Sequence, residues 1–289
     1  MTGFARHFLL AVQYFTRIPI TGPLAGWVGY SPALLRASAA HFPGVGVLVG
    51  AVAAGIAALL LAALPAGPFA PLIAAALSTV ATVLLTGALH EDGLADVADG
   101  LGGSLDRERA LAIMQDSRVG AFGALALVLA IVSKLALLSL IGAVSVRNLC
   151  VGLVLGHVVS RAWPLLLIRW LPHVGAASGS KSKPLADRIS DRSLAAALAW
   201  LVLALALAGW LQGVSLLLAP LSASLVALAV MWRLLQRRLQ GFTGDCLGAT
   251  QQVCEIAFYL GLALALRLCG WCAMRSLWWR PGCATAPPT

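Results

Sequence analysis

Residues 42–64 read FPGVGVLVGAVAAGIAALLLAAL, and neither a charged residue nor a histidine interrupts the chain between Phe42 and Leu89. This run is long enough for two membrane-spanning helices of about 20 residues each. Three prolines between Pro65 and Pro71 cannot continue a helix, so we expect the two spans to be joined there. The sequence therefore predicts that the chain enters a membrane.

The same apolar pattern recurs along the chain. We expect further spans at about residues 119–142, at 149–171, at two segments within 193–232, and at a weaker segment of about 256–273. Of the 289 residues, 60% are hydrophobic and 11% are charged, and the mean hydropathy is +0.92. These values exclude a soluble globular enzyme, a disordered chain and a disulfide-stapled secreted module. The predicted fold class is all-α: a polytopic integral membrane helical bundle of about seven transmembrane helices, in one domain of residues 1–289.

Basic residues favour one side of the predicted spans. If the interfacial segment 1–36 is cytoplasmic, loops 90–118, 172–192 and 233–255 are cytoplasmic too, and this side collects 13 Lys and Arg against 3 on the other. The positive-inside rule then predicts a multi-pass protein of the cell inner membrane, with its chemistry facing the cytoplasm. The net charge of +9 is attributed to contact with an anionic lipid bilayer, and no nucleic acid partner is expected. The apolar run 8–15 is short and is followed by Arg17-Ile-Pro, so no signal peptide is expected.

Acidic residues crowd into one loop. Seven of the 11 acids lie between Glu91 and Asp116, and residues 90–103 read HEDGLADVADGLGG. Asp92, Asp96 and Asp99 fall on one face of a helix, where like charges repel. Carboxylate oxygens are the ligands that Mg²⁺ prefers, so the spacing predicts a Mg²⁺ site. The alternative is a solvated acidic loop with a glycine-rich turn.

Cationic side chains lie where phosphate groups would approach. Arg118 begins the third span and is expected to bind phosphate, with a role as a lipid-side anchor as the alternative. Arg161 lies inside the fourth span and should face the bundle interior, with an aspartate or a phosphate as partner. Lys134 lies in the middle of the third span, where it binds substrate or forms a structural ion pair.

Four more positions are candidates for substrate binding. Asp245 ends the sequence GFTGD and could ligate a second metal, hold a ribose hydroxyl or cap a helix. Lys181 and Lys183 lie in a glycine-containing loop that could clamp a diphosphate, and contact with lipid is the alternative. His41 precedes the first span, where packing or capping competes with a binding role.

Six segments in the same order as in one enzyme family make the chain resemble the cobalamin synthases, the adenosylcobinamide-GDP ribazoletransferases. They are FTRIP (15–19), FPGVG (42–46), HEDGLADVADGLGG (90–103), IMQDSRVG (113–120), Ser160-Arg161 and GFTGDCLGA (241–249). The resemblance extends from residue 15 to about residue 260. The tail, residues 273–289, has no counterpart, and no role is assigned to it.

The resemblance implies a Mg²⁺-dependent membrane transferase that joins adenosylcobinamide-GDP to α-ribazole, or to α-ribazole 5′-phosphate, and releases GMP in a late step of vitamin B12 biosynthesis. The resulting hypothesis assigns Mg²⁺ to the three aspartates. Arg118 and Arg161 stabilise charge on the phosphoryl group, and Asp99, by preference, or His90 removes a proton from the attacking hydroxyl.

Two other functions are weighed against this one. A CDP-alcohol phosphotransferase acting on a lipid also places spaced aspartates at a membrane face, although its motif differs. A cation-coupled transporter could use Lys134, His157 and Arg161 as an intramembrane relay, but its acids should lie at mid-membrane. The sequence is compatible with a homo-oligomer and does not fix the oligomeric state.

Overall fold

A computed structural model describes the backbone of residues 2–175 and 189–278 and the side chains of residues 3–175 and 189–267. The named elements in these ranges are all helical. In chain order they are α1 (Thr2–Phe15), α2 (Gly22–Val28), α3 (Pro32–Ser38), the 3₁₀ turn η1 (Ala39–His41), α4 (Phe42–Ala63), α5 (Ala70–Thr86), α6 (Leu89–Gly103), α7 (Arg107–Met114), α8 (Ala121–Val144), α9 (Val146–Trp170), α11 (Asp191–Gln212), α12 (Ser215–Arg238) and α13 (Gly244–Trp278).

Six segments of the described chain are long and apolar enough to cross a membrane. They are Pro32–Ala63, which contains α4, and then α8, α9, α11, α12 and the first 24 residues of α13. Helices α5 and α6 pass the same test only together, as a pair bent by 88°. Counting this pair as one crossing gives seven, which confirms the predicted polytopic helical bundle.

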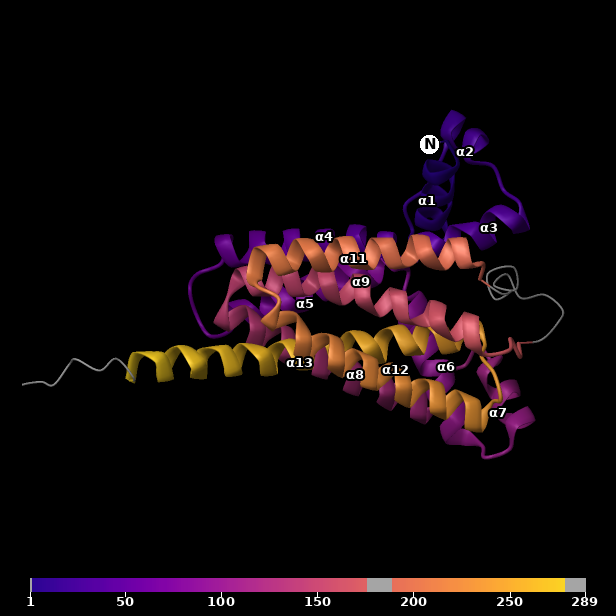
Figure 1. The fold of residues 1–289 in the computed structure, drawn as a ribbon. Helices are drawn as coiled ribbons and strands as arrows, with labels where there is room; N and C mark the ends of the chain where they lie inside the picture. The colour runs from indigo at the N-terminus through magenta and orange to yellow at the C-terminus, as the bar shows by residue number, and fades with distance from the viewer. Residues whose placement is uncertain (1, 176–188, 279–289) are drawn as a thin grey trace, which may run out of the picture.

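The spans lie alongside one another, and α1 to α3 project from the bundle near the same end as α6 and α7 (Figure 1). We call this the α7 end. Arg238, at the end of α12, donates to the carbonyl oxygens of Leu101 (3.1 Å) and Ser104 (2.6 Å), which fixes α6 there. The backbone N–H of Val174 donates to the Phe242 carbonyl at 2.9 Å, so the chain after α9 is joined to the α12–α13 link at the same end.

Helix α9 is the centre of the bundle. In the apolar stretch of α9, 83% is buried inside the protein, whereas in the apolar stretches of α8 and α11 only 17% is buried. Helices α8 and α11 therefore present most of their surface outward, as expected of lipid-facing helices. Glycines let α4 approach α9 closely: a Cβ atom at Gly46 would lie 2.4 Å from the His157 carbonyl oxygen, and one at Gly50 would lie 2.6 Å from the Val154 Cα. Small residues at this contact are what membrane helices use to pack backbone against backbone.

A sharp turn separates α5 from α6. Gly87 has φ of +66° and Ala88 has φ of +57°, so two successive residues adopt the left-handed conformation. The turn changes the chain direction by 88° and sends the acidic helix α6 against α8 and α13.

The last span differs from the prediction. Residues 233–255 were expected to form a loop and the span was expected at about 256–273, but α12 continues to Arg238 and α13 begins at Gly244. The polar residues Gln251, Gln252 and Glu255 are therefore inside a helix and buried. Hydropathy alone cannot predict that these polar side chains lie inside a span, because their hydrogen-bond and ion-pair partners are on other helices.

Candidate active site

The acidic residues of α6 lie on one helix, as predicted, but in different surroundings. Asp92 is exposed, Asp96 is half-buried and Asp99 is buried. The Asp99 carboxylate accepts the backbone N–H of Gly120 at 2.7 Å and that of Gly123 at 2.8 Å. These groups belong to the N-terminus of α8, where a carboxylate satisfies amides that have no helical partner. Asp99 thus anchors α8 to α6.

A fourth acid joins the α6 aspartates from a distant part of the chain. Asp245 lies in the first turn of α13, and its carboxylate accepts the Thr243 hydroxyl at 3.2 Å. Gly93 permits the contact, since a Cβ atom there would lie 2.6 Å from the Asp245 carbonyl oxygen. Asp96 experiences like charge from Asp245, Asp92 and Asp99, in decreasing order. The carboxylates of α6 and α13 are therefore close enough for their charges to interact.

These acids do not form a preformed metal cage. Among the described side chains, residues 3–175 and 189–267, no three His, Cys, Asp or Glu residues are arranged to hold a metal ion. Mg²⁺ commonly takes one or two carboxylates from a protein and the rest of its ligands from phosphates and water. Asp92 and Asp96, one helical turn apart, fit that donor set, with Asp245 beside them. Asp99 fits it less well, because both of its oxygens already accept N–H groups.

A second polar cluster is buried inside the bundle. Lys134 Nζ of α8 lies 3.2 Å from Glu255 Oε1 of α13, and His157 Nδ1 of α9 lies 3.6 Å from Glu255 Oε2. Arg161 is 2% exposed and is 2.9 Å from His157 Nδ1 through Nη1. Arg161 faces the bundle interior as predicted, and in the described part of the chain the acids whose charge acts on it are Glu255 and Glu91, where an aspartate or a phosphate was predicted. Lys134 takes the ion-pair alternative in this structure.

Three buried polar atoms of this region have no hydrogen-bond partner. They are His90 Nε2, Glu91 Oε2 and Arg161 Nε. Their residues line a small polar cavity with Lys134 and Glu255. Unsatisfied polar atoms are costly in a membrane interior, so this cavity is suited to a water molecule or a polar group that supplies the missing partners.

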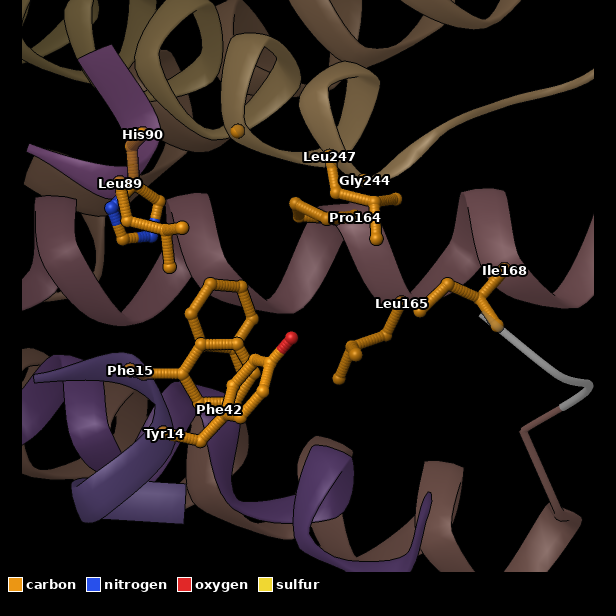
Figure 2. Close-up of a pocket in the computed structure, with 11 residues that line it drawn as sticks. Tyr14, Phe15, Phe42, Leu89, His90, Pro164, Leu165, Ile168, Gly244 and Leu247 are labelled. Carbon is orange, nitrogen blue, oxygen red and sulfur yellow. The ribbon is translucent and has the colours of Figure 1, made fainter. Parts of the chain in front are cut away.

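His90 also borders a larger apolar pocket, which we call the aromatic pocket (Tyr14, Phe15, Phe42, His90, Leu165 and Ile168). The Phe15 and Phe42 rings stack with centroids 4.2 Å apart, and the His90 ring stacks on Phe42 at 5.7 Å with an interplanar angle of 3°. Figure 2 shows these rings on one side and the Leu165 side chain of α9 extending toward them. The aromatic pocket also touches Gly244, the neighbour of Asp245.

Other predicted residues lie apart from the acids. The Arg118 side chain is 87% exposed and pairs with Asp116 at 2.6 Å. Hydrogen bonds from Arg118 hold the pKa of the Asp116 carboxyl at about 2, below its ordinary value. His41 is buried among aromatic rings and accepts the Trp200 indole N–H at 3.2 Å, which agrees with the packing alternative. Lys181 and Lys183 lie outside the described residues.

The polar residues Glu91, Gln252 and Glu255 of the buried cluster were given no role from the sequence. Gln252 links the others: its amide oxygen accepts Lys134 Nζ at 2.9 Å and its amide nitrogen donates to Glu91 at 2.9 Å. For Gln252 and Glu255 the sequence did offer a signal: with Gln251 they form a group of polar residues directly before an apolar run that begins at Ile256. In a membrane protein such residues indicate an interior network.

Comparisons with known proteins agree on one family. A family model described as cobalamin-5-phosphate synthase matches residues 7–263. The chain is 61% identical over 280 residues to an adenosylcobinamide-GDP ribazoletransferase of Albidiferax ferrireducens, covering 92% of this chain and 100% of the relative. A protein of the same name from a Polaromonas species is 64% identical, with 92% and 99% covered, and one from Vibrio cholerae is 40% identical, with 90% and 94% covered. No solved structure matches significantly.

Proposed function

The chain belongs to the cobalamin-5-phosphate synthase family, and from this premise we propose that it is an adenosylcobinamide-GDP ribazoletransferase. The observation that supports this most strongly is the match of nearly the whole chain to relatives of that name at 61% and 64% identity. It favours this function over the CDP-alcohol phosphotransferase and the transporter that the sequence left open.

The proposed reaction is a phosphoryl transfer to α-ribazole or its 5′-phosphate. A ribose hydroxyl oxygen forms a bond to the phosphorus nearest the cobinamide, and the bond from this phosphorus to the oxygen that bridges it to GMP breaks. The hydroxyl proton passes to a base on the enzyme and GMP leaves with the bridging oxygen. Such transfers depend on positioning and on compensation of charge.

We propose Asp92 and Asp96, supported by Asp245, as the residues that hold Mg²⁺ together with the diphosphate. When bound, Mg²⁺ would compensate charge on the oxygens of the transferring phosphoryl group. Two features support the assignment: Asp92 and Asp96 lie one turn apart, and the negative charges of Asp245 and Asp92 act on Asp96. Neither of these two carboxylates accepts a hydrogen bond from the described residues.

The remaining roles follow from the surroundings of each side chain. His90 is our preferred base, because Nε2 has no partner, whereas Asp99 is engaged in anchoring α8. Arg118 lies two residues before Gly120, the amide bound by Asp99, and its exposed guanidinium can exchange Asp116 for a phosphate. We assign Arg161 to the support of His90 through the buried cluster, with no phosphate contact.

We further propose that the α7 end faces the cytoplasm and that the membrane is the cell inner membrane. The excess of Lys and Arg in the segments at this end supports the orientation. The phosphorylated substrates and the acids of α6 would then share one compartment.

Purified protein incubated with adenosylcobinamide-GDP and α-ribazole tests the function. We expect GMP to be released only when both substrates are present, and its release to stop when the divalent cation is chelated. CDP-alcohol supplied with a lipid acceptor should give no CMP. Release of CMP without release of GMP would replace the proposed function by the phosphotransferase alternative.

A further inference from the structure

The proposed reaction gives no role to the apolar walls of the aromatic pocket. Its walls are the stacked rings of Phe15, Phe42 and His90, with Leu165 facing them across the pocket. Flat apolar surfaces of this kind bind flat apolar ligands, because stacking and burial act together. The polar groups on the named walls are few, chiefly the Tyr14 hydroxyl and the His90 ring.

The aromatic pocket lies beside the acids. It touches Gly244, which precedes Asp245, and His90, at the start of α6. Gly248 keeps α13 close to α6 at this point, since a Cβ atom there would lie 3.2 Å from the His90 Cα. A ligand seated in the aromatic pocket would therefore extend its polar part toward the carboxylates of α6 and α13.

We infer that the aromatic pocket binds the benzimidazole base of the acceptor nucleoside. The inference rests on the proposed function. A benzimidazole is a flat, apolar bicycle whose only free polar atom in a nucleoside is one ring nitrogen. The donor offers no equal match: guanine has several hydrogen-bonding groups that apolar walls would leave unsatisfied, and the corrin ring carries many amide groups.

His90 gives the aromatic pocket its polar contact. It borders both the aromatic pocket and the small polar cavity that it shares with Lys134 and Glu255. With the base stacked against the rings, the attached ribose would extend past Gly244 toward Asp245. The same pocket would thus choose the acceptor and place its hydroxyl.

Leu165→Phe narrows the aromatic pocket and provides the test. We expect the KM for α-ribazole to rise about tenfold or more, the size of effect that small changes in an apolar pocket produce. The KM for adenosylcobinamide-GDP should stay unchanged. The nucleoside of unsubstituted benzimidazole, which is smaller than the dimethylbenzimidazole of α-ribazole, should be affected less than α-ribazole. Leu155→Phe is the matched control, since Leu155 lies on the same helix and lines a separate apolar groove.

Leu165→Ala covers the case in which the larger side chain prevents folding. This variant should accept nucleosides of bulkier tricyclic bases better than the wild type does. A rise in the KM for the donor with no change for the acceptor, or equal responses to all bases, would overturn the inference. A wild-type protein that releases no GMP would instead overturn the proposed function. If a fatty acid inhibited the enzyme while Leu165→Phe left the KM for α-ribazole unchanged, the aromatic pocket would be a lipid site. This result would also overturn the inference.

Discussion

Asp96 and Asp99 lie on one helix and differ in what surrounds them. Asp99 is held by two backbone N–H groups of α8, whereas the charges that act on Asp96 are those of other aspartates, Asp245 first. A carboxylate that is already paired serves the structure, whereas one that faces like charge is stabilised by a cation. We therefore assign stability to Asp99 and chemistry to Asp96.

Asp96→Asn should lower the rate of GMP release about 100-fold or more, because the carboxylate holds the ion that compensates charge on the transferring phosphoryl group. Thermal unfolding in detergent should be unchanged or shifted upward, because removal of a charge relieves repulsion from Asp92 and Asp245. Glu108→Gln, an exposed acid on α7, is the control and should keep full activity. Near-normal turnover of Asp96→Asn would remove the metal-site hypothesis.

Asp99→Ala should lower the stability of the folded protein by about 1–3 kcal/mol, because the amides of Gly120 and Gly123 lose their acceptor. Asp99→Asn should recover part of this loss, since its amide oxygen can still accept one N–H group. Denaturant unfolding in detergent measures both variants. Unchanged stability together with complete loss of activity would contradict this role and return Asp99 to the metal ligands.

At the scale of elements, the α4–α9 contact depends on glycine. Gly46→Ala should destabilise the bundle, because its Cβ atom would collide with the backbone of α9 at His157. Gly55→Ala is the matched control on the same helix, where nothing lies within 4 Å, and it should cause no loss. Thermal unfolding of the two variants compares them. Equal stabilities would show that α4 and α9 do not pack as described.

The buried cluster joins α8, α9 and α13 through Glu255. Glu255→Gln should destabilise the protein by about 3–5 kcal/mol, because it leaves the buried Lys134 ammonium without its ion-pair partner. Adding Lys134→Met should restore part of the stability, so the double variant should be more stable than Glu255→Gln alone. Losses that simply add would show that the two side chains are not coupled.

The sequence predicted some elements well and others poorly, for identifiable reasons. Apolar runs predicted the spans of α4, α8 and α9, and the spacing of Asp92, Asp96 and Asp99 predicted a helix where α6 lies. The start of α13 was missed, because Gln251, Gln252 and Glu255 resemble a loop until their partners on α6, α8 and α9 are known. The anchoring role of Asp99 was missed for the same reason: Gly120 and Gly123 are more than 20 residues away in the sequence.

For the whole molecule, the proposed orientation predicts which end meets the cytoplasm. Leu105 is 88% exposed at the α7 end, and Val214 is 66% exposed between α11 and α12. Leu105→Cys should react with a membrane-impermeant maleimide in inverted vesicles and Val214→Cys in spheroplasts, each above the wild-type background. The reverse pattern would place the acids on the other side of the membrane.

The most direct measurement is GMP release by the purified wild-type protein from adenosylcobinamide-GDP and α-ribazole, with Mg²⁺ present and after its removal by a chelator. We predict one GMP for each corrinoid joined to ribazole, loss of the reaction on chelation, and recovery when Mg²⁺ is restored. Formation of the joined product at an equal rate in the chelated sample would contradict the central claim that the carboxylates of α6 act through a divalent ion.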